Sequence, residues 1–223
     1  MTGTFYDHAY YESHYGRFLP DDSYYDLKAR FWRKAISALW SLEPSARLLD
    51  YGCGLGQVSA GFEDCHYYDL AEFSRSFLAR RGRTVYGDPS AIPRGEFDVV
   101  LSSHALEHTK NPSEQLEQFS QYAAARGVLI LILPIERDLR AHFEVDTNNH
   151  LFTWTFQTIT NLLHASGWQP CRQAFIYDSF LLKRLGRIMP DGMAVVWAWR
   201  LGRVFRSYRS MFIVSRKRDI SRD

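Results

Sequence analysis

The sequence has few of the features that mark a secreted or membrane-spanning protein. Three cysteines among 223 residues are too few for a disulfide framework, and no Cys-x-x-Cys pair is present. No stretch reaches the roughly 18 uncharged apolar residues of a transmembrane helix. The first 17 residues are polar and aromatic and lack the apolar core of a signal peptide. We therefore expect a cytoplasmic protein with reduced thiols.

An excess of charge of one sign is also missing, because 27 Lys and Arg residues oppose 25 Asp and Glu residues, which leaves a formal charge of +2. This balance excludes a basic surface over the whole chain, so nucleic acid is not the expected partner. The charges are nevertheless separated along the chain. Residues 180–223 contain eleven basic and three acidic residues, and the remainder is acidic on balance.

Short apolar runs alternate with helical patterns along most of the chain. The expected strands are residues 47–51, 65–69, 83–86, 97–103, 127–133, 171–177 and 211–215. The expected helices are about residues 23–42, 72–81, 113–125 and 155–166, with a short helix from about Gln57. This alternation predicts an α/β fold whose parallel sheet is covered on both faces. Ligands of such sheets bind at the edge where the strands end.

A glycine-rich turn follows the first expected strand. It reads Asp50-x-Gly52-x-Gly54-x-Gly56, and glycines there let the backbone turn tightly and approach a ligand. The spacing differs from the Gly-x-Gly-x-x-Gly of dinucleotide-binding turns, and no Gly-x-x-x-x-Gly-Lys-Ser/Thr phosphate loop is present. A pyrophosphate ligand is therefore disfavoured.

Several segments, taken in order, resemble one known family. Leu48-Leu49-Asp50-Tyr51-Gly52-Cys53-Gly54-Leu55-Gly56 is similar to motif I of the class I S-adenosylmethionine-dependent methyltransferases. The further matching segments are Tyr68-Asp69-Leu70, Gly87-Asp88-Pro89, Phe97 to His108, and His150 to Thr155 with Ala165 to Trp168. The last pair resembles the small-molecule (type 11/23-like) subgroup. The resemblance implies a Rossmann-like fold with a mostly parallel seven-stranded sheet and an antiparallel last strand.

The same resemblance implies S-adenosylmethionine as cofactor and S-adenosylhomocysteine as product. Asp69 would accept hydrogen bonds from both ribose hydroxyls, and Asp88 would accept one from the adenine amine. Asp50 and the backbone of the glycine turn would hold the methionine end. The expected cofactor-binding residues are Asp50, Gly52, Cys53, Gly54, Gly56, Asp69, Leu70, Asp88, Pro89 and Ser103. The interval from Asp50 to Asp69 is shorter than the family pattern, which implies a clipped first helix.

Three histidines are candidates for the acceptor side. Methyl transfer requires alignment of the reactants, and a base where the acceptor is a hydroxyl. His104 and His108 are the expected catalytic residues, with His104 preferred as base or substrate orienter. Alternatively, Glu107 and His108 brace the turn. His150 is expected to contact substrate or to pair with the loop before it.

A metal cluster is a further alternative for this segment. The spacing His104-x-x-Glu107-His108 resembles the Glu-x-x-Glu-His cluster of some methyltransferases that act on quinones or RNA ends. A mixture of Glu and His side chains can hold a divalent ion. Since the first position is histidine rather than glutamate, no metal ligand is predicted from the sequence.

The two ends of the chain carry separate expectations. Residues 1–45 are expected to form an aromatic lid and helical segment, with Tyr11 and Tyr15 over the site, and residues 46–223 the methyltransferase domain. Packing of these tyrosines on the flank of the sheet is the alternative. Residues 178–209 form a basic, amphipathic insertion, which would lie on a membrane surface, cover the acceptor pocket, form a homodimer contact or simply pack on the domain.

The function expected from these features is methyl transfer from S-adenosylmethionine to a small molecule or a glycan or lipid-linked precursor, mainly at oxygen. N-methylation is the alternative reaction. A catalytically silent protein that binds S-adenosylmethionine and docks to membranes through its C-terminal third is the alternative of another class. If the insertion binds lipid, the protein would associate peripherally with a membrane.

Overall fold

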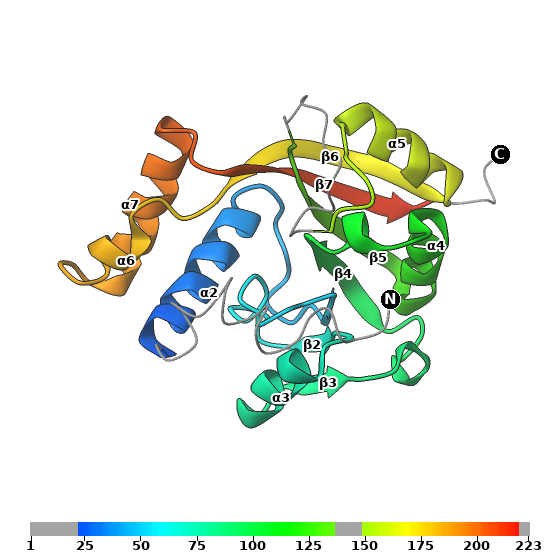
Figure 1. The fold of residues 1–223 in the computed structure, drawn as a ribbon, viewed down its shortest axis with the longest axis horizontal. Coiled ribbons are helices and arrows are strands. Elements are labelled where there is room, and N and C mark those ends of the chain that lie inside the picture. Colours follow the sequence, from blue (N-terminus) through cyan, green and yellow to red (C-terminus); the bar gives the residue numbers. More distant parts are fainter. Residues whose placement is uncertain (1–21, 137–148, 219–223) are drawn as a thin grey trace.

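The computed structural model describes residues 22–136 and 149–218, which form a seven-stranded sheet with helices on both faces (Figure 1). The strands are β1 (Leu48–Tyr51), β2 (Cys65–Tyr68), β3 (Thr84–Tyr86), β4 (Phe97–Ser103), β5 (Ala123–Pro134), β6 (Trp168–Tyr177) and β7 (Arg209–Lys217). The helices are α2 (Asp22–Ser37), α3 (Glu72–Arg80), α4 (Pro112–Tyr122), α5 (Phe156–Ala165), α6 (Leu182–Leu185) and α7 (Asp191–Val204). Two short 3₁₀ turns are η1 (Pro89–Ala91) and η2 (Leu106–His108).

The strand order is β3-β2-β1-β4-β5-β7-β6. Strands β1 to β5 pair in parallel, whereas β7 runs antiparallel between β5 and β6. The expected Rossmann-like fold with an antiparallel last strand is thus confirmed. Because β1 lies beside both β2 and β4, the order of the strands reverses between β1 and β4. Such a reversal opens a crevice at the carboxyl ends of the strands, where α/β proteins bind ligands.

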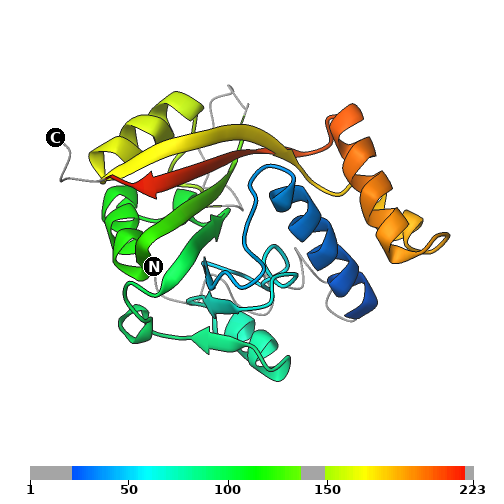
Figure 2. The same cartoon turned by 180° about the vertical axis from the view of Figure 1, so that it is seen from behind.

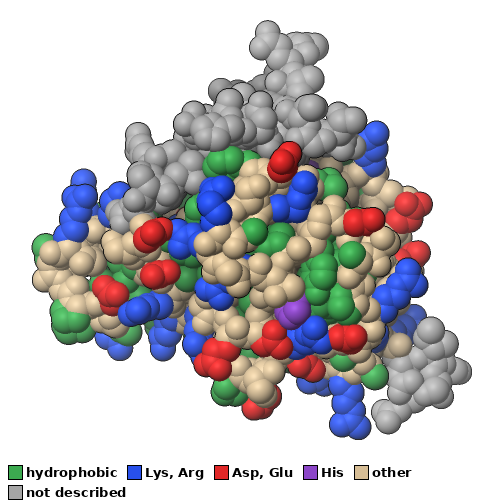
Figure 3. Space-filling model, turned by 90° about the horizontal axis from the view of Figure 1, so that it is seen from below, with side chains coloured by type: hydrophobic (Ala, Val, Ile, Leu, Met, Phe, Trp, Pro, Cys, Tyr) green, Lys and Arg blue, Asp and Glu red, His purple; other side chains and the backbone are tan. Residues whose placement is uncertain are grey.

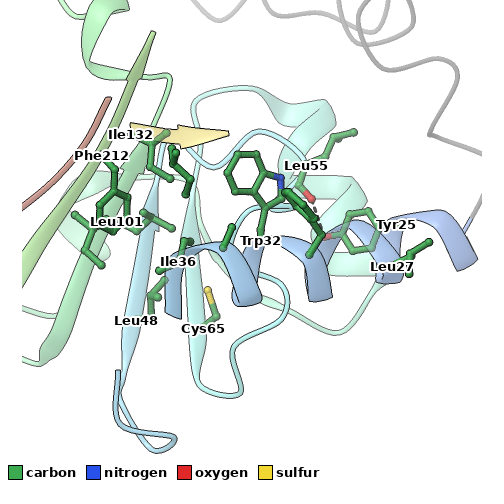
Figure 4. Close-up of a cluster of buried hydrophobic side chains, with 14 of the residues drawn as sticks. Tyr25, Leu27, Trp32, Ile36, Leu48, Leu55, Cys65, Leu101, Ile132 and Phe212 are labelled. Atoms are coloured by element: carbon green, nitrogen blue, oxygen red, sulfur yellow. Dashed lines mark hydrogen bonds between the residues drawn. The ribbon is translucent and has the colours of Figure 1, made fainter. Parts of the chain in front are cut away.

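Alternate side chains of the sheet enter two apolar cores. On one face, Leu48, Leu101, Ile132 and Phe212 pack with Ile36 and other residues of α2 (Figure 4). On the other face, residues such as Leu49, Leu131 and Ile213 pack with apolar residues of α4 and α5. The two cores explain why β4 and β5 are nearly continuous apolar runs, since both of their faces are covered.

Sequence patterns explain where several helices begin. The buried positions of α2 include Tyr24, Leu27, Phe31 and Ala35, which recur every three or four residues on one face. Asn111 caps α4 just before Pro112 in the first turn. Thr155 forms a capping box with Thr158 at the start of α5.

Some expected elements differ in the structure. The helix expected over residues 23–42 ends at Ser37, because residues 38–40 form a tight turn before Pro44. The short helix expected from Gln57 is not formed, and residues 57–64 make turns and bends. A Cβ at Gly61 would lie 2.7 Å from the Ala29 carbonyl oxygen. The backbone of residues 57–64 therefore packs directly on α2, which leaves too little space for the side chains of a helix.

Residues 178–208 connect β6 to β7 and contain helices α6 and α7. Helix α7 lies beside α2 at the end of the sheet, in both views of the molecule (Figures 1 and 2). Arg30 pairs with Asp191 at 3.2 Å, and Lys34 lies over the Trp199 ring. No helix in the two described ranges is long and apolar enough to cross a membrane.

Candidate functional site

A cavity of about 570 Å³ opens at the carboxyl ends of β1, β2 and β4. It lies where the strand order reverses, which is the position that the fold predicts for a ligand. Its lining comes from the glycine turn, the ends of β2 and β4, helix α2, and the start of β7. Segments distant in the sequence therefore share one site.

The glycine turn provides backbone at the wall of this cavity. Gly52 has φ +72°, and a Cβ placed there would lie 2.5 Å from the Cβ of Ala105. Both the left-handed conformation and the close approach require glycine at this position. Tyr25 of α2 donates a hydrogen bond to the Leu55 carbonyl at 2.8 Å, which ties the turn to the helix.

Asp50 is a buried carboxylate at the end of β1. Its Oδ2 accepts a hydrogen bond from the Ser59 hydroxyl at 2.5 Å, whereas Oδ1 has no partner among the described residues. Burial raises the pKa of Asp50 to about 7, the charge of Asp69 adds to the rise, and the Ser59 bond opposes it. A cation entering the cavity would therefore find a carboxylate that lacks a compensating charge.

Asp69 lies at the end of β2 and holds the glycine turn in place. Its Oδ2 accepts the Gly54 N–H and its Oδ1 the Ala71 N–H, both at 2.8 Å. Burial raises the pKa of Asp69, while these two bonds lower it. An ionised carboxylate has about four acceptor positions, so Asp69 retains capacity for hydroxyl donors.

These residues fit the cofactor that the sequence resemblance implies. S-adenosylmethionine has a cationic methionine end and a ribose diol. Asp50, with its unpartnered Oδ1, would hold the ammonium, and Asp69 would accept from the diol. Gly54, which lines the cavity, has φ +53° and open space where a Cβ would lie, so the turn presents bare backbone there.

His104 lies in the cavity wall just after β4. Its Nε2 is 3.0 Å from the Ser210 hydroxyl on β7, and its backbone has φ +51°, which is strained for a non-glycine residue. Burial lowers the pKa of His104 to about 4, and the nearby His150 contributes in the same direction. The imidazole is therefore neutral at pH 7, and its low pKa makes it a weaker base than an exposed histidine.

A cluster of titratable side chains adjoins His104. Glu107 in η2 is fully buried, and its Oε1 lies 3.7 Å from His104 Nδ1 and 4.0 Å from His150 Nε2. Burial raises the pKa of Glu107 to about 7. The rings of His108 and His150 meet edge to face at 4.8 Å, which places the two histidines side by side.

The structure brings most of the predicted site residues together. The cavity is lined by Asp50, Gly52, Cys53, Gly54, Asp69, Leu70, Ser103, His104 and His108. Gly56 is buried below the turn, where a Cβ would meet Tyr67 and Leu78. His150 lies beside His108, with Nε2 4.0 Å from Glu107 Oε1, and is not among the residues that line the cavity. Tyr11 and Tyr15 lie outside the described residues.

Asp88 and Pro89 are also not among the residues that line the cavity. The Asp88 carboxylate is exposed and accepts the Ser90 N–H at 2.8 Å, as the cap of η1. Hydrogen bonds from Ser90 lower the pKa of Asp88. Contact between Asp88 and an adenine amine stays a prediction.

Sequence reasoning missed the residues that close the cavity opposite the turn. Lys28 of α2 donates to Asp178 Oδ1 at 2.8 Å, and Trp32 and Tyr208 complete this wall. Lys28 lies on the buried, mainly apolar face of α2. A lysine at such a position indicates that an acidic partner lies nearby, so the sequence did contain a signal for this pair. Nothing local in the sequence marks Asp178 or Tyr208, because their approach depends on the path of β6 and β7.

A family model described as a methyltransferase domain matches residues 23–173, which is more than half of the chain. The matched range contains the glycine turn, Asp50 and Asp69, and the histidine cluster of His104, His108 and His150. No curated protein matches the sequence.

Solved structures of similar fold come from several organisms. Burkholderia thailandensis 1,6-didemethyltoxoflavin-N1-methyltransferase, with S-adenosylhomocysteine bound, is 19% identical, with a TM-score of 0.60 over 93% of this chain and 84% of that one. A putative methyltransferase in complex with Haloferax volcanii Trm112 is 15% identical, with a TM-score of 0.61 over 91% and 97%.

Haemonchus contortus phosphoethanolamine N-methyltransferase 2, in complex with S-adenosyl-L-methionine, is 15% identical. Its TM-score is 0.57, over 84% of this chain and 52% of that one, so the chain spans about half the length of that enzyme. At these identities the likeness establishes the fold.

Proposed function

This chain belongs to the methyltransferase domain family, and we propose that it methylates an oxygen atom of a small-molecule or glycan-type acceptor. It is an S-adenosylmethionine-dependent methyltransferase, in line with neighbours of the same fold that hold S-adenosylmethionine or S-adenosylhomocysteine. The observation that carries the proposal is the unpartnered Asp50 carboxylate in a cavity that His104 also lines. The carboxylate that would bind the cationic donor and the candidate base therefore line the same cavity.

S-adenosylmethionine supplies a methyl group on a sulfonium, which departs as a neutral thioether. Asp50 and Asp69 would hold the donor at the β1 and β2 ends, and the buried cavity would align donor and acceptor. His104 would accept the acceptor's hydroxyl proton on its neutral imidazole as the oxygen attacks. The Ser210 hydroxyl, 3.0 Å from Nε2, would fix the orientation of the ring.

His104→Ala tests the assignment of oxygen as the acceptor atom. Formation of S-adenosylhomocysteine would be measured with phenols, sugars and primary amines as three acceptor sets, together with the product mass. We expect methylated phenol or sugar, and a loss of about 100- to 10,000-fold in kcat for His104→Ala. His66→Ala is a control outside the cavity. Methylation of hydroxyls at an unchanged rate in His104→Ala would contradict the role of His104.

N-methylation is the second candidate, because two neighbours are named as N-methyltransferases. An amine that binds uncharged already has a lone pair and depends less on a base. Turnover of amines alone, with His104→Ala nearly as fast as the wild type, would favour this reaction. Binding of S-adenosylmethionine with no turnover of any acceptor would favour a catalytically silent protein.

The basic segment 178–209 supports a membrane-surface role beside the reaction. Its exposed large apolar residues are Leu181, Ile188, Met193, Trp197, Val204, Phe205 and Tyr208. On α7, Met193, Trp197 and Val204 share one face, and Arg200 lies over the Trp197 ring. At the end of the molecule where Figure 1 places α6 and α7, Figure 3 shows apolar and basic side chains adjacent at the surface. This combination fits an anionic lipid surface.

Flotation with vesicles of phosphatidylcholine and phosphatidylserine tests this surface. We expect the full chain to float at low salt, and Arg200→Glu/Arg203→Glu/Arg206→Glu to stay in the dense fraction. Reversal of three exposed arginines elsewhere, Arg80, Arg94 and Arg126, is the matched control. Failure of the wild type to float would remove the membrane role. A dimer mass by sedimentation that the α7 variant abolishes would assign this surface to a second copy.

A further inference from the structure

The cluster behind His104 has a geometry that the proposed reaction does not use. Glu107 offers a carboxylate oxygen, and His108 and His150 each offer a ring nitrogen, with these ligand atoms within 4.8 Å of one another. The three residues come from η2 and from the segment before α5. His104 Nδ1 lies 3.7 Å from the same carboxylate, on the cavity side.

The Glu107 side chain is fully buried, with 0% of its surface exposed. Neither carboxylate oxygen accepts a hydrogen bond from any described residue. Burial of a carboxylate without hydrogen bonds or a compensating charge is costly. A cation among the ligand atoms would supply that compensation.

In both histidines Nδ1 forms a hydrogen bond to an oxygen atom, as the ring nitrogen that does not bind the metal does in metal sites. His150 Nδ1 pairs with the carboxylate of Glu136, and His108 Nδ1 is 3.2 Å from the Asn149 carbonyl oxygen. A carbonyl oxygen only accepts, so His108 Nδ1 donates a proton. Nε2 then carries the lone pair in His108, and the Glu136 carboxylate favours the same tautomer in His150. Carboxylate and carbonyl partners of this kind orient the histidines of metal sites.

We propose that Glu107, His108 and His150 bind a divalent transition-metal cation, with Glu136 and the Asn149 carbonyl as positioning groups. Two imidazoles and one carboxylate are a recurrent ligand set for Zn²⁺ that leaves a fourth position open. Nitrogen ligands disfavour Mg²⁺ and Ca²⁺, which prefer oxygen.

The spacing of the ligand atoms is compatible with such an ion after a small contraction. Ligands about 2.1 Å from a tetrahedral Zn²⁺ lie about 3.4 Å from one another. The outermost pair in the cluster therefore has to close by at most about 1.4 Å, a movement that side-chain rotation supplies. His104 Nδ1 lies 3.7 Å from the Glu107 carboxylate, next to the proposed ligands.

Calorimetric titration of the full chain with ZnCl₂, after removal of bound metal by chelation and dialysis, tests the site. We expect one equivalent to bind, and Glu107→Gln and His150→Gln to weaken the affinity by at least about 100-fold. Glu136→Gln should weaken it by about 10- to 100-fold, the effect of losing an orienting partner. His66→Gln is the matched control, because His66 also pairs with a carboxylate, Asp64, but lies outside the cluster.

Thermal unfolding supplies a second readout that does not involve turnover. Zn²⁺ should raise the Tm of the wild type and of His66→Gln, but not of Glu107→Gln, since only a ligand bound to the folded state stabilises it. Calorimetry with S-adenosylmethionine confirms that each variant is folded. Absence of stoichiometric binding to the wild type, or equal Zn²⁺ affinity in Glu107→Gln, would overturn the proposal.

Discussion

Charged side chains differ in burial between two regions of the molecule. One region is the sheet edge formed by β1, β2 and β4, and the other is the segment 178–209. At the sheet edge, Asp50 and Glu107 are buried and Asp69 is partly buried, and burial raises the pKa of each carboxyl group. In the segment 178–209, arginines such as Arg184, Arg200 and Arg203 are exposed among exposed apolar side chains.

The difference indicates two kinds of ligand. A buried carboxylate keeps its charge only if a cation or hydrogen-bond donors meet it, so the sheet edge is organised for a small, complementary ligand. An exposed basic and apolar surface retains its hydration and makes many weak contacts, which suits an extended surface. Variants at the first region should alter binding strongly, and variants at the second should leave the fold intact.

The largest effect is expected from Gly52→Ala. The added Cβ would lie 2.5 Å from the Cβ of Ala105, in a left-handed backbone, so the turn or the Ala105 segment has to shift at the cavity wall. We expect the affinity for S-adenosylmethionine to fall by about 100-fold, the order of loss that a 1 Å misplacement produces. Gly82→Ala is the control, because Gly82 has φ +69° but open space around its Cβ. Equal losses in both variants would show that backbone strain alone is responsible.

The next effect concerns pH. Asp50 has a pKa of about 7 in the folded chain, against 3.8 in the absence of burial. Between these values the folded chain holds a proton that the unfolded chain has released, so the stability from Asp50 is complete below pH 3.8 and decreases as the pH rises to about 7. A cationic ligand requires the ionised form and follows the opposite trend.

We therefore expect S-adenosylmethionine to bind about tenfold more tightly at pH 8 than at pH 6. Calorimetry at both pH values with the wild type and Asp50→Asn would measure this. Asp50→Asn keeps the shape of the side chain but cannot ionise, so its affinity should depend little on pH. The same pH dependence in both proteins would assign the titration to another group.

A smaller effect is expected where the two regions meet. Lys28 Nζ pairs with Asp178 at 2.8 Å and joins α2 to the start of the segment 178–209. The lysine is largely buried, but the Asp178 side chain is 37% exposed, so solvent weakens the pair. Lys28→Met should lower the free energy of unfolding by about 1–2 kcal/mol in urea titrations. A loss below the experimental error would mean that packing alone joins these elements.

The smallest effect is expected on the exposed face of α7. Val204 is 74% exposed, so Val204→Ser should change the free energy of unfolding by less than about 0.5 kcal/mol. Ala198, on the buried face of the same helix, is the contrast, since Ala198→Leu overfills the contact and should cost about 1–3 kcal/mol. Urea unfolding of both variants measures this, and a large loss in Val204→Ser would show that the exposed face is covered.

The fold was largely predictable because its signals are local. The apolar runs at 97–103 and 127–133, and the turn after Asp50, identify buried parallel strands and a ligand-binding edge. The boundaries that differ depend on tertiary contacts. No helix forms after Gln57, where Gly61 packs directly on the backbone of α2, and β5 begins at Ala123 because it pairs with β4.

The sequence predicted the residues around the expected cofactor position, but it did not predict the contacts of Lys28 with Asp178 or of His150 with Glu107. Asp50, Gly52 and Asp69 stand at motif positions, and the structure places them around one cavity. The pairing of Lys28 with Asp178 depends on two segments separated by 150 positions, which no local pattern reports. The approach of His150 to Glu107 likewise depends on a loop that returns to η2, where the Leu151 N–H binds the Glu107 carbonyl at 2.9 Å.

Calorimetric titration of the full chain with S-adenosylmethionine at pH 8, in the wild type, Asp69→Ala and Asp178→Ala, measures whether the donor binds at the β2 end. We expect one binding site in the wild type and a loss of about 10- to 100-fold in Asp69→Ala, because hydrogen bonds to a partly buried carboxylate are lost. Asp178→Ala, at the opposite wall, should bind within a few fold of the wild type. Absence of binding to the wild type, or unchanged affinity in Asp69→Ala, would show that S-adenosylmethionine does not bind at Asp69.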